Sequence, residues 1–379
     1  MPEKPDKKGF PHFMLKEIFD QPKALEDTIA PRISLPDGEV HLGDEVRIGA
    51  EELRALRRIN IVASGTSRHA GMAGAYMFQD LAHLPVDIDY ASEFEYRNPM
   101  VGRSELTIVI TQSGETADTT AAQREAKKKG SRTIAISNVV GSTIAREADG
   151  VLYTHAGPEI SIASTKAFTA QMAVLFLFGC YLAQVRGALE KAVLRKWLDE
   201  LVALAAKTET VLKSSTQCER LAERFYESEG FLFLGRAIHY PVAMDGALKL
   251  KEVSYIHAEG YPSGETKHGP NALIDEHLPI VIIATRDLND EGSVLRHEKN
   301  LSNIRGFKEQ SAPVIAVATE GDKEISSLAD HTIFIPPAPE LLSPILEIVP
   351  LQLFAYYVAV KKGLDVDRPR NLVKSVMQE

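Results

Sequence analysis

Short apolar runs recur along the first half of the chain and alternate with segments of helical periodicity. A short helix is predicted over Met14–Leu25, and a Pro-Asp-Gly turn follows at 36–38. Strands are then predicted at Ile59–Ala63, Val86–Tyr90, Leu106–Thr111, Thr133–Ser137 and Val151–Thr154, of which the third is apolar, β-branched and short. Because helical patterns lie between these strands, we predict an α/β fold with a doubly wound parallel sheet and helices on both faces.

The same alternation begins again in the second half of the chain. Long helices are predicted over 165–185 and 189–228, and a strand with a glycine turn follows at Gly230–Gly235. A helix and three more strands are predicted at Pro241–Ile256, Pro279–Ala284, Pro313–Ala318 and Thr332–Ile335. The two strand–turn–helix units are about 170 residues apart, which is too far for a solenoid repeat and predicts two similar domains.

This duplication predicts where the domains begin and end. The expected parts are an N-terminal segment with a short helix, a first domain, connecting helices, a second domain and a C-terminal arm, at 1–50, 51–187, 188–228, 229–364 and 365–379. A length of 379 residues is sufficient for two such domains.

Composition narrows the class of protein. The chain is 44% hydrophobic and 25% charged, as expected of a globular protein. A net charge of −9 argues against binding to nucleic acid and for a small ligand held locally. Cys180 and Cys218 lack metal-site spacing, which predicts a reduced, cytoplasmic protein with no metal. No run of about 18 apolar residues and no signal-peptide pattern is present, so no membrane association is expected.

Two loops rich in hydroxyl groups follow neighbouring predicted strands. Thr111–Thr116 precedes an Ala-rich helix, and Ser64–Ser67 repeats the same combination of hydroxyls and a glycine. A helix N-terminus offers backbone N–H groups and a positive dipole end, so these loops predict a site for an anion such as phosphate. An ordinary helix cap is the alternative, and we prefer it for a third cluster at Ile160–Lys166. No GxGxxG motif follows the first strand, which argues against a nicotinamide cofactor.

The second half of the chain holds three candidates for proton transfer or covalent chemistry. Lys249 and Glu252 share one helix face. The commoner meaning of such a pair is a solvated ion pair, and the alternative is that Glu252 acts as a base beside the lysine in a cleft. His268 lies in a Gly- and Pro-rich segment, 259–270, that predicts a loop, and it is either merely exposed or a proton donor. Lys374, near the end of an apolar arm, is either exposed or able to form an imine with a carbonyl substrate.

Together these segments resemble the isomerase half of glucosamine-6-phosphate synthase, also called glutamine–fructose-6-phosphate aminotransferase (isomerizing). The resemblance extends from about Phe13 to Glu379 and implies two sugar-isomerase (SIS) domains. The motifs that carry it are, in order, Ser64–Ser67, Tyr90–Phe94, Thr111–Thr119, Ala163–Thr169, Leu248–Glu252, Gly264–Pro270 and Arg370–Val376.

The resemblance also implies roles for individual residues. Lys374 would form an imine with the open-chain ketose, and Glu252 would move a proton between C1 and C2. Lys249 would support proton transfer, and His268, donated by the neighbouring subunit of a homodimer, would assist ring opening. The residues that would bind the sugar phosphate are Thr66, Ser67, Thr111, Gln112, Ser113, Thr116, Ile162, Ser164 and Val373.

Some positions depart from the family pattern. Ser64 stands where Cys is common, Thr111 where Ser is usual and Val373 where Ala is common, and all three changes are conservative. The N-terminal cysteine that hydrolyses glutamine in the family is replaced here by Met1-Pro2, and the first cysteine is Cys180. We therefore expect no glutaminase activity, and nitrogen supplied by free ammonia or by a separate glutaminase partner. Three interpretations stay open: a natural stand-alone isomerase unit, a domain cut from a longer protein, or a relative adapted to another amino sugar.

The expected reaction is conversion of fructose 6-phosphate to glucosamine 6-phosphate with ammonia, or to glucose 6-phosphate without it. No cofactor is needed for either. Two alternatives share the same resemblance. One is a related SIS enzyme that deglycates a fructosamine phosphate or deaminates an amino-sugar phosphate, and the other, less favoured, is a non-catalytic sugar-phosphate sensor.

Overall fold

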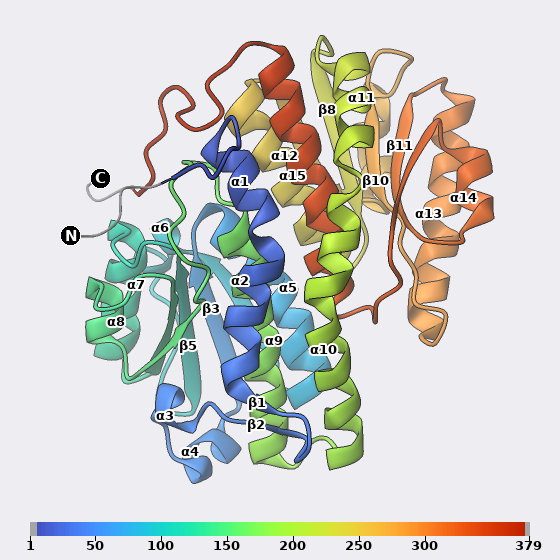
Figure 1. Ribbon diagram of the computed structural model, residues 1–379. Helices are drawn as coiled ribbons and strands as arrows, with labels where there is room; N and C mark the ends of the chain where they lie inside the picture. The colour runs from blue at the N-terminus through green and yellow to red at the C-terminus, as the bar shows by residue number, and fades with distance from the viewer. Residues whose placement is uncertain (1–5, 376–379) are drawn as a thin grey trace. The chain divides into compact units, whose positions relative to one another are not determined.

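The computed structural model describes residues 6–375 and divides into two compact units (Figure 1). Among the described residues, the first unit comprises 23–159, 166–203 and 373–375, and the second comprises 6–22, 160–165 and 204–372. Each unit contains one five-stranded sheet. The predicted N-terminal segment and C-terminal arm extend into 1–5 and 376–379, which lie outside the described residues.

The sheet of the first unit is wholly parallel. Its strands lie in the order β4-β3-β5-β6-β7. They are β3 (Arg58–Ala63), β4 (Val86–Tyr90), β5 (Glu105–Thr111), β6 (Arg132–Ser137) and β7 (Gly150–Tyr153). The parallel α/β architecture predicted for this half of the chain is confirmed, because the five strands form at the predicted positions.

Helices cover both faces of this sheet (Figure 1). On one face, Ile61 and Ile110 lie so close to Gly71 of α5 that a Cβ there would come within 2.7 Å of Ile61 Cγ2. On the other, Val62 and Val109 pack in a buried cluster with residues of α7 and α8. The helices and the small hairpin of this unit are η1 (Ala30–Arg32), β1 (Ile33–Ser34), β2 (Glu39–Val40), α3 (Gly43–Val46), α4 (Ala50–Ala55), α5 (Gly65–Ala82), α6 (Ala91–Phe94), α7 (Ala117–Lys128), α8 (Thr143–Glu147) and α9 (Lys166–Arg186).

The second unit repeats this topology. Its parallel strands lie in the order β12-β11-β10-β8-β9. Numbered along the chain within each sheet, both sheets have the strand order 2-1-3-4-5, so the predicted duplication is confirmed. The strands are β8 (Gly230–Gly235), β9 (His257–Pro262), β10 (Ile280–Ile283), β11 (Val314–Thr319) and β12 (His331–Ile335).

Strand β9 corrects the prediction that 259–270 is a loop. The Gly and Pro of this segment suit an edge strand, because β9 pairs only with β8 and Pro262 is its last residue. Gly260 is needed for packing, since a Cβ there would lie 2.5 Å from the Cα of Met244 in α12. The helix predicted over Met14–Leu25 is two helices, α1 (Phe13–Phe19) and α2 (Gln21–Ile29), rather than one.

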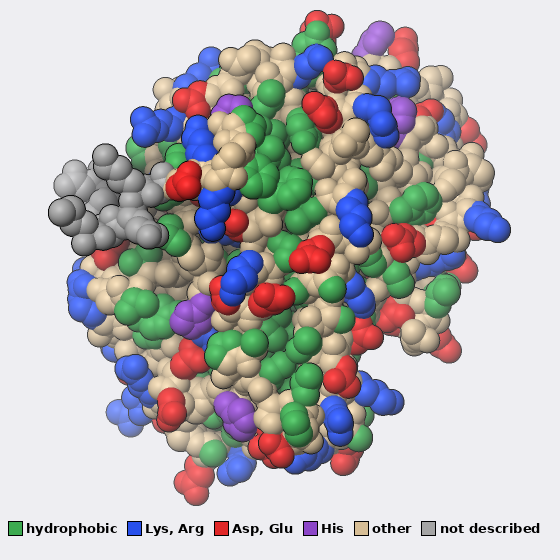
Figure 2. Space-filling view, in the orientation of Figure 1, with side chains coloured by type: hydrophobic (Ala, Val, Ile, Leu, Met, Phe, Trp, Pro, Cys, Tyr) green, Lys and Arg blue, Asp and Glu red, His purple; other side chains and the backbone are tan. Residues whose placement is uncertain are grey.

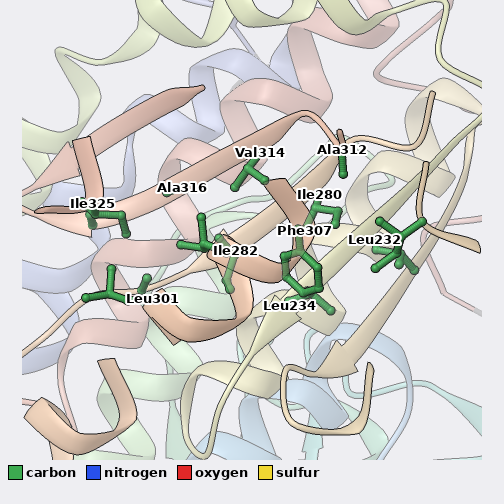
Figure 3. Packing of buried hydrophobic residues seen from close by; sticks show 14 residues of the cluster. Leu232, Leu234, Ile280, Ile282, Leu301, Phe307, Ala312, Val314, Ala316 and Ile325 are labelled. Carbon is green, nitrogen blue, oxygen red and sulfur yellow. The ribbon is translucent and has the colours of Figure 1, made fainter. Parts of the chain in front are cut away.

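Aliphatic residues fill the space between the second sheet and two of its helices (Figure 3). Leu232, Ile282 and Val314 of the strands pack against Leu301 and Phe307 of α13 in one buried cluster. The helices of this unit are α1 (Phe13–Phe19), α11 (Ser215–Phe225), α12 (His239–Ser254), η2 (Glu265–His268), η3 (Pro270–Leu273), α13 (Glu291–Glu309), α14 (Lys323–Leu328) and α15 (Ser343–Lys361). Two more helices, α2 (Gln21–Ile29) and α10 (Lys191–Leu212), include residues of both units.

Two helices, α9 and α15, are long and apolar enough to cross a membrane by length and composition. Their most apolar windows are 83% and 89% buried inside the protein, respectively. Each packs beside the helix that follows the first strand of its sheet, α9 against α5 and α15 against α12. Helices that are apolar on every side are typical of a large protein core as well as of a membrane, and here burial accounts for their composition.

Candidate functional site

The two hydroxyl-rich loops lie at the carboxyl edge of adjacent strands in the first unit. Ser64–Ser67 comprises the N-cap residue and the first turn of α5 directly after β3, and Thr111–Thr116 runs from the last residue of β5 to the N-cap of α7. The strand order reverses between β3 and β5, and ligands of open α/β sheets bind in the crevice at such a switch point. The fold therefore brings together the N-termini of two helices, of 18 and 12 residues, at the position where an anion is best held.

The hydroxyl groups of these loops do not cap the helices. Ser64 and Thr116 occupy the N-cap positions of α5 and α7, but neither side chain makes a capping hydrogen bond. Instead, the Oγ1 atoms of Thr111 and Thr116 lie 3.0 Å apart, and the Gly114 N–H donates to Thr111 Oγ1 at 3.3 Å. Ser113 Oγ accepts a hydrogen bond from the Glu115 N–H at 3.2 Å. This arrangement favours an anion site over ordinary capping.

Residues behind the Thr111–Thr116 loop fix its shape. Gly114 has a φ of +70°, and a Cβ at this position would lie 2.0 Å from Ser142 Oγ. The Glu115 carboxylate accepts a hydrogen bond from the Thr143 N–H at 2.9 Å, and this bond lowers the pKa of Glu115. The loop is thus tied to the start of α8.

A glutamine that sequence reasoning missed orients the first loop. Gln171 is buried in α9, and its Nε2 donates to Ser67 Oγ at 3.0 Å. The pairing joins residues 104 positions apart, so no local motif signals it. Thr66, next to Ser67, is also buried, whereas Gln112 and Ser113 of the second loop are partly exposed.

Lys374 belongs to the first unit, where it contacts a buried carboxylate. Its Nζ donates to Glu159 Oε2 at 2.7 Å, and the Lys374 side chain is 26% exposed. Val373 beside it is 64% exposed. The alternative of a fully solvated lysine therefore does not hold, and Glu159 is a second residue that sequence reasoning missed.

The loop that carries Ile162 and Ser164 belongs to the second unit and is held from two sides. The Glu17 carboxylate of α1 accepts hydrogen bonds from the N–H groups of Ile160 and Ser161. The Ile162 N–H donates to the backbone oxygen of Asp367 at 3.1 Å. Ile162 and Ser164 themselves are partly exposed, so both remain available to a ligand.

Lys249, Glu252 and His268 also lie in the second unit. Lys249 is 0% exposed and forms an ion pair with Glu252 one helical turn along α12, so this is not the solvated surface pair considered as an alternative. Glu252 is partly exposed and can accept a proton from a ligand. His268 ends the short helix η2 with its side chain exposed.

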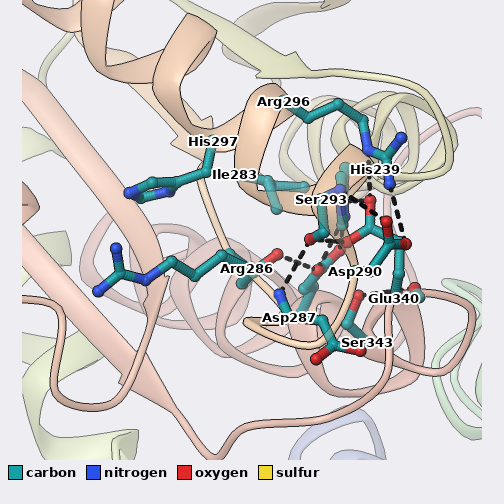
Figure 4. Close-up of polar contacts among 12 residues, drawn as sticks. His239, Ile283, Arg286, Asp287, Asp290, Ser293, Arg296, His297, Glu340 and Ser343 are labelled. Atoms are coloured by element: carbon teal, nitrogen blue, oxygen red, sulfur yellow. Dashed lines mark hydrogen bonds and ion pairs between the residues drawn. The ribbon is translucent and has the colours of Figure 1, made fainter.

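The second unit contains a largely buried ionic network that joins α12, α13 and α15 to Glu340 (Figure 4). Glu340 accepts hydrogen bonds from Ser293 Oγ and, at 2.6 Å, from Arg296 Nε. His239 lies 3.0 Å from both Glu340 and Glu347. Burial alone would lower the pKa of His239, but these two carboxylates outweigh it and raise the pKa to about 10. Burial would raise the pKa of Glu340, but His239, Ser293 and Arg296 lower it to about 2.

Within residues 6–375, no group of three or more His, Cys, Asp or Glu side chains is arranged to hold a metal ion. In the first unit, hydroxyls and backbone N–H groups are available for an anion, and Lys374 is available for covalent chemistry. In the second unit, Glu252 and His268 are available for proton transfer.

Comparison with known proteins identifies the class to which this site belongs. The model of the SIS domain family matches residues 52–179 and 224–362, and the chain therefore belongs to the SIS domain family. It is similar over its whole length to glutamine–fructose-6-phosphate aminotransferase (isomerizing) from Chlorobaculum tepidum, at 48% identity over 377 residues. The protein of that name from Thermus thermophilus is also 48% identical. The chain spans 60% of the length of each of these two relatives.

Solved structures agree with this assignment. The C-terminal domain of glucosamine-fructose-6-phosphate aminotransferase from Francisella tularensis has a TM-score of 0.90 and 39% identity, covering 96% of this chain and 100% of that one. The resemblance predicted from the sequence motifs is thus confirmed. Glucosamine-6-phosphate deaminase from Thermotoga maritima, with a TM-score of 0.71 and 22% identity over 96% of this chain and 99% of that one, shares the fold.

Proposed function

We propose that this chain converts fructose 6-phosphate to glucosamine 6-phosphate with ammonia, and to glucose 6-phosphate in its absence. The observation that carries the proposal is the pair of hydroxyl loops at the switch point between β3 and β5, whose hydroxyls are not used as helix caps. The names of the relatives that are 48% identical support fructose 6-phosphate as the substrate.

The two loops are assigned to the phosphate. Its oxygens accept hydrogen bonds from hydroxyls and from backbone N–H groups at the helix N-termini, which also supply favourable dipoles. The residues assigned to this role are Ser67, Thr111, Gln112, Ser113 and Thr116. Those assigned to the sugar hydroxyls and their surroundings are Thr66, Ile162, Ser164 and Val373.

The chemistry is assigned to four side chains. The Lys374 amine attacks C2 of the open-chain ketose, water leaves, and an imine forms. Ammonia then replaces the lysine at C2, and the Glu252 carboxylate moves a proton from C1 to C2, which converts the ketimine to the amino aldose. The buried Lys249, paired with Glu252, supports this transfer. His268 assists ring opening.

The proposed partners follow from the same assignment. His268 is exposed, which supports its donation to a neighbouring subunit of a homodimer. Ammonia comes from solution or from a separate glutaminase. On the face drawn in Figure 2, basic and acidic side chains are interspersed, which supports a small ligand and not a nucleic acid. Cys180 and Cys218 are both buried and unpaired, which supports a cytoplasmic location.

The direct test incubates the purified chain with fructose 6-phosphate and either ammonium or glutamine, followed by an assay for amino sugar and for glucose 6-phosphate. We expect amino sugar with ammonium only. Product from glutamine alone would contradict the absence of glutaminase activity, and no turnover of either kind would contradict the enzymatic function. Turnover of a fructosamine phosphate or of glucosamine 6-phosphate in preference would favour a related SIS activity instead.

A further inference from the structure

Glu159 is a buried carboxylate in the first unit to which the roles above assign no function. Its side chain is 0% exposed, yet it lies in the connection between β7 and α9 and not in the hydrophobic core. Oε2 accepts a hydrogen bond from Lys374 Nζ at 2.7 Å, and Oε1 accepts one from the Ala167 N–H at 3.1 Å. Burying an ionised carboxylate costs several kcal/mol unless it is paired, and these two contacts help to offset that cost.

The two oxygens of Glu159 have different partners. Oε1 binds the first turn of α9, a helix of 21 residues whose positive dipole end stabilises a negative charge. Oε2 faces the amine. Val373, adjacent to Lys374, is 64% exposed, so the arm at this point is not packed into the core. The bond to Glu159, which is itself tied to the first turn of α9, therefore gives the Lys374 amine a defined position.

A lysine that forms an imine must first lose a proton, because an ammonium group has no lone pair with which to attack a carbonyl carbon. A general base within about 2.6–3.2 Å of the nitrogen can take that proton. Glu159 Oε2, at 2.7 Å, meets this geometric requirement.

We propose that Glu159 is the base that deprotonates Lys374 and the acid that completes imine formation. This inference rests on the proposed function, because it requires that Lys374 react with the ketose. A proton moves from Nζ to Oε2, and the nitrogen lone pair then bonds to C2 while the carbonyl π electrons move to oxygen. A proton passes from the nitrogen to that oxygen, which gives a carbinolamine. The Glu159 proton then leaves with the hydroxyl group as water, the protonated C=N bond forms, and the carboxylate is restored.

The experiment traps the imine with borohydride in the presence of fructose 6-phosphate and locates the adduct by peptide mass. Glu159→Gln is the informative variant, because an amide oxygen still accepts the Ala167 N–H but no longer takes a proton from Lys374. We expect the trapping rate to fall by about 10²- to 10⁴-fold, as is typical when a general base is lost, with fructose 6-phosphate affinity within about threefold of the parent chain. Glu147→Gln, which removes a partly exposed carboxylate paired with Arg124 in the same unit, is the matched control and should trap at the parent rate.

A second variant separates a chemical role from a purely structural one. In Glu159→Ala, added formate should restore part of the trapping rate, because a small carboxylate can replace the missing base, whereas added chloride should not. Trapping at the parent rate in Glu159→Gln, or no rescue of a folded Glu159→Ala chain by formate, would overturn the inference and leave the proposed function standing. Absence of a Lys374 adduct in the parent chain itself would overturn both.

Discussion

Replacing Gly114 by alanine tests whether the shape of the Thr111–Thr116 loop creates the phosphate site. Gly114 has a φ of +70°, and a Cβ there would meet Ser142 Oγ at 2.0 Å and Ser142 Cβ at 2.4 Å. A left-handed backbone costs a non-glycine residue about 1–2 kcal/mol. Overpacking of a tight site adds about 1–3 kcal/mol. The native loop geometry therefore becomes about 2–5 kcal/mol less favourable in Gly114→Ala.

The loop can escape this cost only by leaving its native shape, and the site must then be reassembled on binding. At about 1.4 kcal/mol for each factor of ten, the affinity for fructose 6-phosphate should fall by at least about thirtyfold. Isothermal titration calorimetry measures this affinity, with inorganic phosphate as a second probe that makes no contact specific to the sugar.

Gly141 and Ser142 provide matched control variants. Gly141 has a φ of +72° but nothing within 4 Å of its built Cβ, so Gly141→Ala carries the backbone cost without the clash. Adding Ser142→Gly to Gly114→Ala should relieve the clash and recover part of the lost affinity. Parent affinity in Gly114→Ala would refute the reasoning, as would an equal loss in Gly141→Ala.

Three further predictions concern the pH response and the thiols. Since His239 has a pKa raised from 6.5 to about 10 and Glu340 one lowered from 4.5 to about 2, their joint contribution to stability should be complete between about pH 4.5 and 6.5. This contribution should fall as the pH drops toward 2 or rises toward 10. Thermal unfolding of Glu340→Gln should therefore depend less on pH than that of the parent chain. An unchanged pH profile would contradict the prediction. The hydrogen bond from the Thr143 N–H lowers the pKa of Glu115, so the carboxylate holds the loop in place when it is ionised. Glu115→Ala should therefore weaken phosphate binding more at a pH above the ordinary carboxyl pKa than at a pH below it. Calorimetry on either side of that pKa measures the difference. Burial raises the pKa of Cys180, so a thiol reagent such as DTNB should modify it only after denaturation, and modification of the native chain would show that the thiol is accessible.

Nine of the ten strands in the two sheets could be predicted, because most of them are short apolar runs bounded by polar residues or glycine. For example, β4 and β8 occupy the predicted Val86–Tyr90 and Gly230–Gly235. The missed strand, β9, contains Glu259, Gly260 and Pro262, and its glycine is explained by packing against α12 and not by a turn. Local propensity could not indicate β9, because its strand conformation comes from pairing with β8.

The residues of the candidate site that could be predicted are those that form motifs of consecutive residues. The hydroxyl loops follow strands directly, so their position at the carboxyl edge was a consequence of the alternating pattern. The residues that support them come from elsewhere in the chain. Glu159 meets Lys374 across 215 positions, and a pairing at that distance leaves no periodicity or spacing to read.

The apolar helix α15 has a consequence for synthesis on the ribosome. All five strands of the second sheet precede it in the chain, yet α15 packs against α12 and α11 in that unit. Until residues 343–361 have left the exit tunnel, the nascent second unit exposes the surface that α15 covers, and α15 itself emerges with the hydropathy of a membrane segment. Translation of this last stretch is therefore the interval in which chaperones, targeting factors and aggregation compete for the chain.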